Sequence, residues 1–224
     1  MTKENEIPGL VYRKIDLHIH TPASKCFDDK SVKPEDIIKK ALDEKLDAIA
    51  ITDHNTGEWV DEIKKASKNK LIIFPGVEIS VLGGKKGVHI IGIFDKSKTT
   101  KHIENLLGDL KIKSAKYGKE DAYTDKTPNQ VINIISEHGG MAILAHANSK
   151  QGVMGGMKGT PRNKIIQNSN LIAVEATDFN NTDKEKRKTR IIDFLDGNHK
   201  EYRKLAVYQA SDNLSSIKDG KHSL

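Results

Sequence analysis

Short apolar runs alternate with amphipathic stretches along most of the chain, and this alternation constrains the fold more than any other feature. Residues 47–52 form a near-continuous apolar run, which is typical of a strand buried on both faces of a parallel sheet. Residues 34–45 instead place apolar side chains three and four positions apart, and Pro34 suits the first turn of a helix. Repeated units of this kind predict an α/β fold around a parallel sheet.

Seven such runs are long enough to be strands. The predicted strands cover residues 14–20, 47–52, 71–80, 88–94, 141–146, 171–176 and 205–210. The predicted helices cover residues 34–45, 58–67, 128–137 and 183–195, and residues 96–126 are expected to be helix plus loop. Residues 147–160 are expected to be either a mobile lid or a disordered connection, and we favour the connection. With 224 residues, the chain fits a single β/α barrel domain.

Composition narrows the classes of protein to consider. No run approaches the roughly 20 apolar residues of a membrane helix, so we expect a soluble protein. Residues 1–6 are polar, which favours a cytoplasmic location. Cys26 is the single cysteine, so no disulfide is expected within the chain. A net charge of +6, from 37 Lys plus Arg against 31 Asp plus Glu, favours phosphorylated or polyanionic partners. The basic run Lys184–Arg190 and the pair Lys85-Lys86 either attract nucleic acid phosphates or form solvated surfaces. Aromatic residues make up only 5%, so a base-stacking platform is not expected.

Metal-binding residue types fall at the carboxyl ends of the predicted strands. In a β/α barrel those ends converge on one face, where such proteins build their active sites. His18 and His20 lie two apart on one strand and should project to the same side. Mixed imidazole and carboxylate donors suit zinc, manganese or iron better than magnesium or calcium. The candidate residues at these ends are His18, His20, Asp53, His54, Glu78, His146 and Asp212, and His89 adds another imidazole from the fourth predicted strand.

Other polar residues near these positions are more ambiguous. Asp16 and Asp53 adjoin candidate histidines in the sequence and are either acceptors that orient the imidazoles or solvated acids at strand ends. His102, His138 and His199 lie in polar helical or loop segments, where surface exposure is the default, and we assign them no role.

The ordered set of motifs resembles the polymerase and histidinol phosphatase (PHP) superfamily. The resemblance spans nearly the whole chain, and it is specific as an ensemble. It implies a distorted seven-stranded (β/α)7 TIM-like barrel over residues 1–224, with up to three divalent ions. The residues that carry it are His18-Ile19-His20, Thr52-Asp53-His54, Gly76-Val77-Glu78, His89, Ala145-His146 and Ser211-Asp212.

The resemblance also implies which side chains hold each ion. The first ion would be bound by His18, His20, Glu78 and Asp212. Glu78 would bridge to a second ion, which would also be bound by His89 and His146. The family's third ion takes a histidine six residues after the first pair, the histidine after the second strand, and a histidine two residues beyond the final aspartate. Those positions read Cys26, His54 and Leu214 in this sequence.

Leu214 leaves two alternatives, because leucine cannot bind a metal ion. Either the third ion is lost, or His222 replaces the missing ligand across an insertion, and we favour the replacement. A thiolate at Cys26 would bias the site toward zinc or iron. Residues 14–24 and 222–224 also resemble the branch of the family in which the barrel precedes an ATPase of the chromosome-segregation type. We therefore expect that a C-terminal or partner ATPase belongs to the natural protein.

The expected chemistry is hydrolysis of a phosphoester by a metal-activated water, with a phosphorylated substrate such as DNA or RNA. We rank phosphodiester hydrolysis of nucleic acid first and hydrolysis of a small phosphate monoester, as in histidinol phosphatase, second. A third hypothesis is a non-catalytic module that regulates a partner ATPase. The residues expected to carry catalysis are His18, His20, Glu78, His146 and Asp212.

Overall fold

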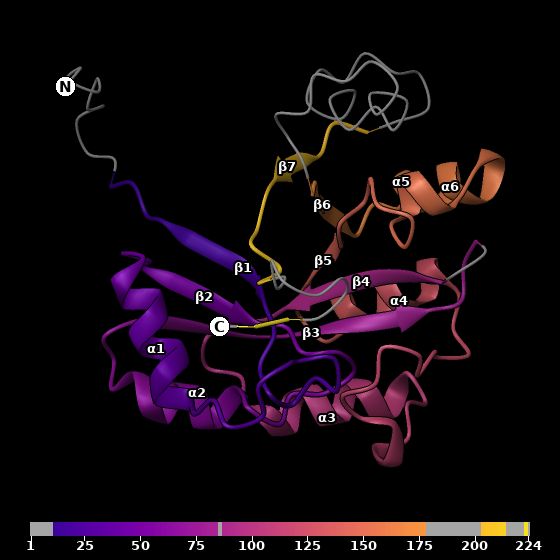
Figure 1. The fold of residues 1–224 in the computed structure, drawn as a ribbon. Helices are drawn as coiled ribbons and strands as arrows, with labels where there is room; N and C mark the ends of the chain where they lie inside the picture. Colours follow the sequence, from indigo (N-terminus) through magenta and orange to yellow (C-terminus); the bar gives the residue numbers. More distant parts are fainter. Residues whose placement is uncertain (1–10, 85–86, 178–202, 214–221, 224) are drawn as a thin grey trace.

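A computed structural model describes residues 11–84, 87–177, 203–213 and 222–223. Its core is one curled seven-stranded sheet in which the strands lie side by side in chain order (Figure 1). This architecture confirms the predicted α/β fold of the distorted PHP barrel type. The strands are β1 (Ile15–Ile19), β2 (Ala48–Ile51), β3 (Ile72–Val81), β4 (Val88–Ile93), β5 (Met141–Leu144), β6 (Leu171–Glu175) and β7 (Ala206–Tyr208).

The expectation of a purely parallel sheet is wrong at β4. This strand runs antiparallel to both β3 and β5, whereas β1, β2 and β3 pair in parallel, as do β5, β6 and β7. The physical reason is the short connection after β3, because a parallel crossover needs a dozen or more residues and a hairpin does not. Gly87, with a φ of +79°, occupies the left-handed region that this tight connection requires.

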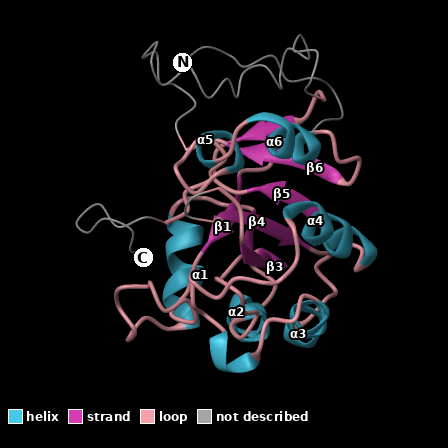
Figure 2. Cartoon of the chain, turned by 90° about the vertical axis from the view of Figure 1, so that its right-hand side faces the viewer, coloured by secondary structure: helices cyan, strands magenta, loops and turns pink. Residues whose placement is uncertain are grey.

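Helices surround the outside of the curled sheet (Figure 2). The helix predicted over residues 128–137 is confirmed as α4, and the segment 96–126 contains the predicted helix as α3. The prediction of a disordered connection over 147–160 is wrong, because α5 and the start of α6 lie there. The helices are α1 (Pro34–Asp43), α2 (Val60–Ser67), α3 (Thr100–Asp109), η1 (Ser114–Lys116), α4 (Pro128–Glu137), α5 (Val153–Gly156) and α6 (Gly159–Ile166).

Some predictions fall on residues that the structure does not describe. They are the basic helix over 183–195 with its run Lys184–Arg190, the pair Lys85-Lys86, His199 and Leu214. Among the described residues, no helix is both long enough and apolar enough to cross a membrane.

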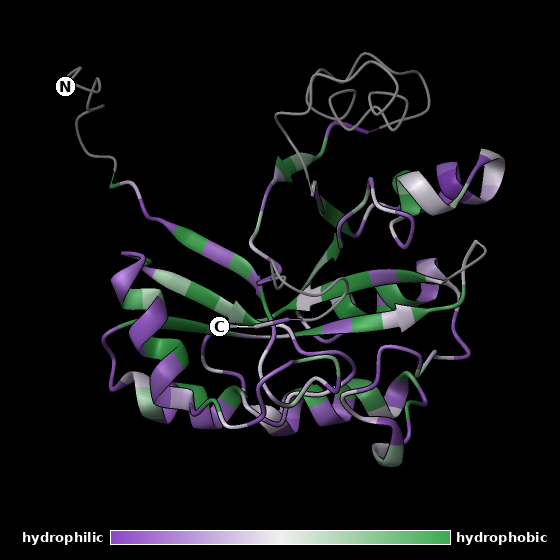
Figure 3. Cartoon of the chain, viewed as in Figure 1, coloured by the Kyte–Doolittle hydropathy of each residue, from purple (hydrophilic) through white to green (hydrophobic). Residues whose placement is uncertain are grey.

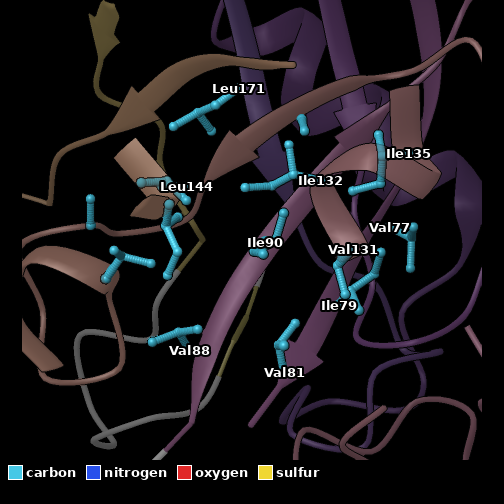
Figure 4. Packing of buried hydrophobic residues seen from close by; sticks show 14 of the residues in the cluster. Val77, Ile79, Val81, Val88, Ile90, Val131, Ile132, Ile135, Leu144 and Leu171 are labelled. Carbon is cyan, nitrogen blue, oxygen red and sulfur yellow. The ribbon is translucent and has the colours of Figure 1, made fainter. Parts of the chain in front are cut away.

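The alternation of side chains along the strands separates two packing layers. On the outer face, Val77, Ile79 and Val81 of β3 pack with the helices in one large apolar cluster (Figure 4). Figure 3 shows the matching pattern, with largely hydrophobic strands and helices that are polar on part of their surface. Burial of each such aliphatic side chain stabilises the fold by about 1.5–3 kcal/mol. Because successive side chains of a strand point to opposite faces, Glu78 projects to the inner face.

The inner face is lined by a second apolar layer that lies inside the curl of the sheet. It contains Ile91 and Ile93 of β4, Ile143 of β5 and Ala173 of β6, with Tyr208 of β7 packed against them. Because side chains alternate between the two faces along a strand, His89 of β4 and Glu175 of β6 also lie on this inner face. The sheet therefore directs chemically active side chains from several strands into one interior.

Candidate metal centre

Glu78 lies at the middle of a buried cluster of histidines. Its Oε1 is 3.0 Å from Nδ1 of His89 and 3.0 Å from Nε2 of His146. Its Oε2 is 3.3 Å from Nε2 of His20 and 3.5 Å from Nε2 of His18. The two oxygens of one carboxylate thus face two different pairs of imidazoles, and only 1% of Glu78 is exposed.

Asp212 completes the first of these pairs. Its Oδ1 lies 3.4 Å from Nε2 of His18 and 3.4 Å from Nε2 of His20. The two Nε2 atoms are themselves 3.0 Å apart, so His18 and His20 do project to the same side. Four donor atoms from β1, β3 and the segment after β7 therefore converge on one point.

A third group of donors lies beside the first two. His54, which follows β2, places Nδ1 2.9 Å from Oε2 of Glu78, and its ring centroid is 4.6 Å from that of His20. The ring of His222 stacks on His20 with a centroid distance of 3.8 Å. One possible ligand atom from each of His20, His54 and His222 falls within 4.8 Å of the others, close enough for the three rings to share an ion.

Backbone strain accompanies this convergence. His146 has a φ of +28° and Asp212 a φ of +51°, in the left-handed region that non-glycine residues seldom occupy. Such conformations persist where the surrounding structure holds them, and they concentrate at functional sites. The backbone at both residues is therefore bent to aim a donor into the cluster.

The electrostatics of the cluster follow from imidazoles and carboxylates packed together away from water. Burial opposes the charged form of His20, but its hydrogen bonds with Asp212 and Glu78 outweigh that effect and raise the pKa of His20 to about 9. Burial would raise the pKa of Glu78, yet attraction to His54, His89 and His18 holds that pKa well below its usual value. The pKa of Asp212 is likewise lowered, because attraction to His18 and the contacts with His20 overcome the effect of burial.

The arrangement fits metal ions better than a network of hydrogen bonds. Nδ1 of His54 lies 2.9 Å from a carboxylate oxygen, yet it makes no hydrogen bond in the described structure. Nε2 of His89 is also buried without a hydrogen-bond partner among the described residues. Buried polar atoms are nearly always paired, so these two unpaired ring nitrogens in a cluster of acids and histidines fit a site for a cation. The mixture of imidazole and carboxylate donors is one that transition metals accept.

Two serines fix the outward nitrogens of the ligand histidines. Ser24 Oγ donates its one proton to Asp53 at 2.6 Å, so it must accept from Nδ1 of His20 at 3.0 Å. That hydrogen bond leaves Nε2 of His20 to face Glu78 and Asp212. Nδ1 of His146 lies 3.0 Å from Ser149 Oγ in the same manner. Asp53 therefore orients an imidazole through Ser24, whereas Asp16 accepts hydrogen bonds from the backbone N–H groups of His18 and Ser211.

Cys26 is the candidate that the structure does not bring into the cluster. Among the described residues, no hydrogen bond or ion pair joins its thiol to a histidine of the cluster, whereas His146 and Asp212 make such contacts. The side chain instead lines a cavity of about 420 Å³ with Lys25, Lys119 and Tyr123. Burial and the nearby acid Glu120 raise the pKa of Cys26 to about 12, which disfavours the thiolate that a metal ion requires. His102 and His138 do not belong to the described groups of close donor atoms. They contact each other instead, with ring centroids 5.6 Å apart.

Glu175 is a residue of the cluster that sequence reasoning missed. It ends β6, and its Oε2 lies 2.8 Å from Nδ1 of His18. The available signal was its position, since it is an acid in a buried strand of otherwise apolar residues.

The chain is similar in sequence to proteins of a known family. The family model described as PHP domain matches residues 16–179. A 5'-3' exoribonuclease of Haemophilus influenzae is 36% identical over 87 residues, which are 38% of this chain and 30% of that protein. A 3',5'-nucleoside bisphosphate phosphatase of Chromobacterium violaceum is 34% identical over 80 residues, 35% of this chain and 27% of that protein. Each of these two matches spans less than a third of the length of the relative concerned.

A solved structure supports the fold. The lesion-specific endonuclease of Pyrococcus furiosus superposes with a TM-score of 0.66 at 16% sequence identity, over 94% of this chain and 48% of that one. At this level of identity the likeness concerns the fold alone.

Proposed function

The chain belongs to the PHP domain family, and from that premise we propose that it is a metal-dependent phosphoesterase acting on nucleic acid or nucleotides. The observation that carries the proposal is the position of Glu78, whose two oxygens face separate pairs of histidines. A carboxylate in that position can bridge two cations, and paired cations are the usual device for phosphoester hydrolysis. We further propose that residues 1–224 form a single PHP domain.

The proposed ligands follow from the contacts. One ion is assigned to each side of Glu78. A third ion is assigned to the place where His54 and His222 approach His20. Zinc, manganese and iron are the candidate metals because the donors are mixed nitrogen and oxygen atoms. The proposed ligands are His18, His20, Glu78 and Asp212 for the first ion, Glu78, His89 and His146 for the second, and His54 and His222 for the third.

In this proposal the residues of the chain bind the ions and orient the histidine rings, and none of them attacks the substrate. Bound divalent ions would polarise the phosphoryl group and lower the pKa of a bound water, so that hydroxide is available near neutral pH. Ser24 and Ser149 hold the rings of His20 and His146, which keeps both Nε2 atoms directed inward. No nucleophilic side chain is required in this scheme.

Phosphodiester hydrolysis is the favoured reaction. The relative from Haemophilus influenzae is described as a 5'-3' exoribonuclease. The net charge of +6 is compatible with a polyanionic substrate. The second candidate is monoester hydrolysis, which the similarity to the nucleoside bisphosphate phosphatase favours.

Metal reconstitution followed by hydrolysis assays tests the proposal. Chelator-treated protein reloaded with Zn²⁺, Mn²⁺ or Fe²⁺ would be assayed on a generic diester, a generic monoester, labelled RNA and DNA, and a 3',5'-nucleoside bisphosphate. We expect metal-dependent cleavage of the diester and of an oligonucleotide, abolished by His20→Ala and retained by His138→Ala as the matched control. Cleavage of the bisphosphate alone would favour the monoesterase. Bound metal without turnover of any substrate would favour the non-catalytic module.

Two finer expectations stay predictions. Association with an ATPase rests on the resemblance of residues 14–24 and 222–224, and neither curated relative named above is described as an ATPase. The cytoplasmic location rests on the single cysteine.

A further inference from the structure

Glu175 contacts two of the proposed metal ligands although it is not placed to bind an ion itself. Its side chain is 1% exposed at the end of β6. Oε2 lies 2.8 Å from Nδ1 of His18 and accepts a hydrogen bond from the backbone N–H of His146 at 3.2 Å. Among the described residues, no group of potential metal ligands includes Glu175.

The contact with His18 fixes which ring nitrogen can serve as a ligand. A carboxylate can only accept a hydrogen bond, so Nδ1 of His18 must carry the proton. Nε2 is then the atom that faces His20 at 3.0 Å and Asp212 at 3.4 Å. Metal-binding histidines commonly depend on such a partner for the orientation of the ring.

The contact with His146 acts on the backbone instead of the ring. His146 has a φ of +28°, and the N–H of the next residue, Ala147, donates to the carbonyl oxygen of Glu175 at 2.7 Å. Side chain and main chain of Glu175 therefore both hold the strained turn after β5. From that turn, Nε2 of His146 reaches Oε1 of Glu78 at 3.0 Å.

His18 and His146 contact different oxygens of the Glu78 carboxylate. His18 faces Oε2 of Glu78, and His146 faces Oε1. One oxygen of Glu175 thus supports a ligand of each proposed ion. We propose that Glu175 is a positioning residue that prepares both ion sites at once, an inference that rests on the proposed metal centre.

The test measures metal binding by chelator-treated protein, apart from any activity. Zn²⁺ and Mn²⁺ would be titrated in competition with a chromophoric chelator into the unaltered protein, Glu175→Gln, Glu175→Ala and a control. Asp109→Asn is a matched control because Asp109 pairs with His138 at 2.8 Å, so it also removes a carboxylate from a histidine, but away from the cluster. Thermal unfolding of each metal-free variant would be followed in parallel.

We expect Glu175→Gln to weaken binding of the first two ions about 10- to 100-fold, the range seen when such outer partners are removed. Asp109→Asn should bind as the unaltered protein does. The metal-free unfolding midpoint of Glu175→Gln should stay close to that of the unaltered protein. In the zinc-loaded protein, the ¹⁵N resonance of His18 Nδ1 should show an attached proton hydrogen-bonded to a carboxylate, and this signature should change in Glu175→Gln.

Three results would overturn the inference. If Glu175→Gln bound both ions as tightly as the unaltered protein, with an unchanged His18 resonance, Glu175 would be only a packing residue. The same conclusion would follow from lower thermal stability with unchanged affinity. Failure of the unaltered protein to bind either ion would instead overturn the metal centre, and the positioning role with it.

Discussion

The imidazole rings of His20 and His222 stack with their centroids 3.8 Å apart and their planes at 24°, although the two residues lie far apart in the sequence. The stack is held from two directions. Nδ1 of His222 donates to the carbonyl oxygen of Asp212 at 2.7 Å, and the carbonyl oxygen of His222 accepts from the N–H of Asp28 at 2.7 Å. Burial, together with repulsion from His20, lowers the pKa of His222 to about 3. His222 therefore presents a neutral ring whose Nε2 is available to a cation.

Replacement of His222 should remove the third ion and spare the first two. His222→Ala leaves His18, Glu78 and His89 in place, so metal analysis of the reconstituted variant is expected to give one ion fewer per chain. Activity should fall by about 10- to 100-fold, the usual effect of a disturbed metal shell. His138→Ala, a histidine outside the cluster, is the control, and an unchanged metal content in His222→Ala would count against the third site.

Cys26 should be dispensable for metal binding. The thiol lies outside the described donor groups and its pKa is raised to about 12. Cys26→Ser is nearly isosteric, so the fold should tolerate it. We expect Cys26→Ser to keep the full metal content and activity within about 2-fold, as a change outside the metal shell should. Loss of an ion in this variant would restore Cys26 as a ligand.

Removal of the charge on Glu78 should damage both sides of the centre. Glu78→Gln keeps the shape of the side chain but offers one oxygen in place of two, so it cannot bridge two cations as a carboxylate does. Activity should fall by at least about 100-fold with loss of tight metal binding. The metal-free variant should also unfold about 3 kcal/mol more easily, because buried histidines lose their anionic partner. Chelator competition and denaturant titration measure the two effects separately.

The metal-free protein should lose stability as the pH rises above neutrality. The pKa of His20 is about 9 in the folded state and 6.5 when unfolded, so the folded state holds the proton more tightly. That stabilisation is complete below pH 6.5 and is lost as the pH rises through 9, with a slope of up to about 1.4 kcal/mol per pH unit for one proton. Metal affinity should rise over the same window, because ions compete with protons for the histidines. Urea unfolding of chelator-treated protein at several pH values tests the slope; a flat profile would contradict it.

The sequence supported prediction of the strands, and of several side chains that the fold brings together, for physical reasons. Buried strands require apolar runs, so β2 and β6 lie where the apolar patterns placed them. His18, Glu78 and Asp212 were identified because donors at strand ends converge in this architecture. The distances between the donor atoms could not be predicted, because these distances depend on the strained backbone at His146 and Asp212.

Other features could not be read from a local pattern. The reversed direction of β4 follows from the length of one connection, and strand periodicity is the same in either direction. α6 was missed because residues 159–166 have no clear apolar face, and the glycines nearby suggested a loop. Glu175 was missed because its partners, His18 and His146, come from β1 and the segment after β5, and only tertiary structure brings them together.

Anomalous diffraction from crystals of the metal-loaded protein, measured at the absorption edge of the bound metal, is the most direct test of the account. We expect one strong peak on each side of Glu78. The first should lie among His18, His20 and Asp212, and the second between His89 and His146. A third peak is expected beside His54 and His222. Absence of any peak at Glu78 in crystals saturated with zinc or manganese would contradict the central claim that these side chains form a cage for divalent cations.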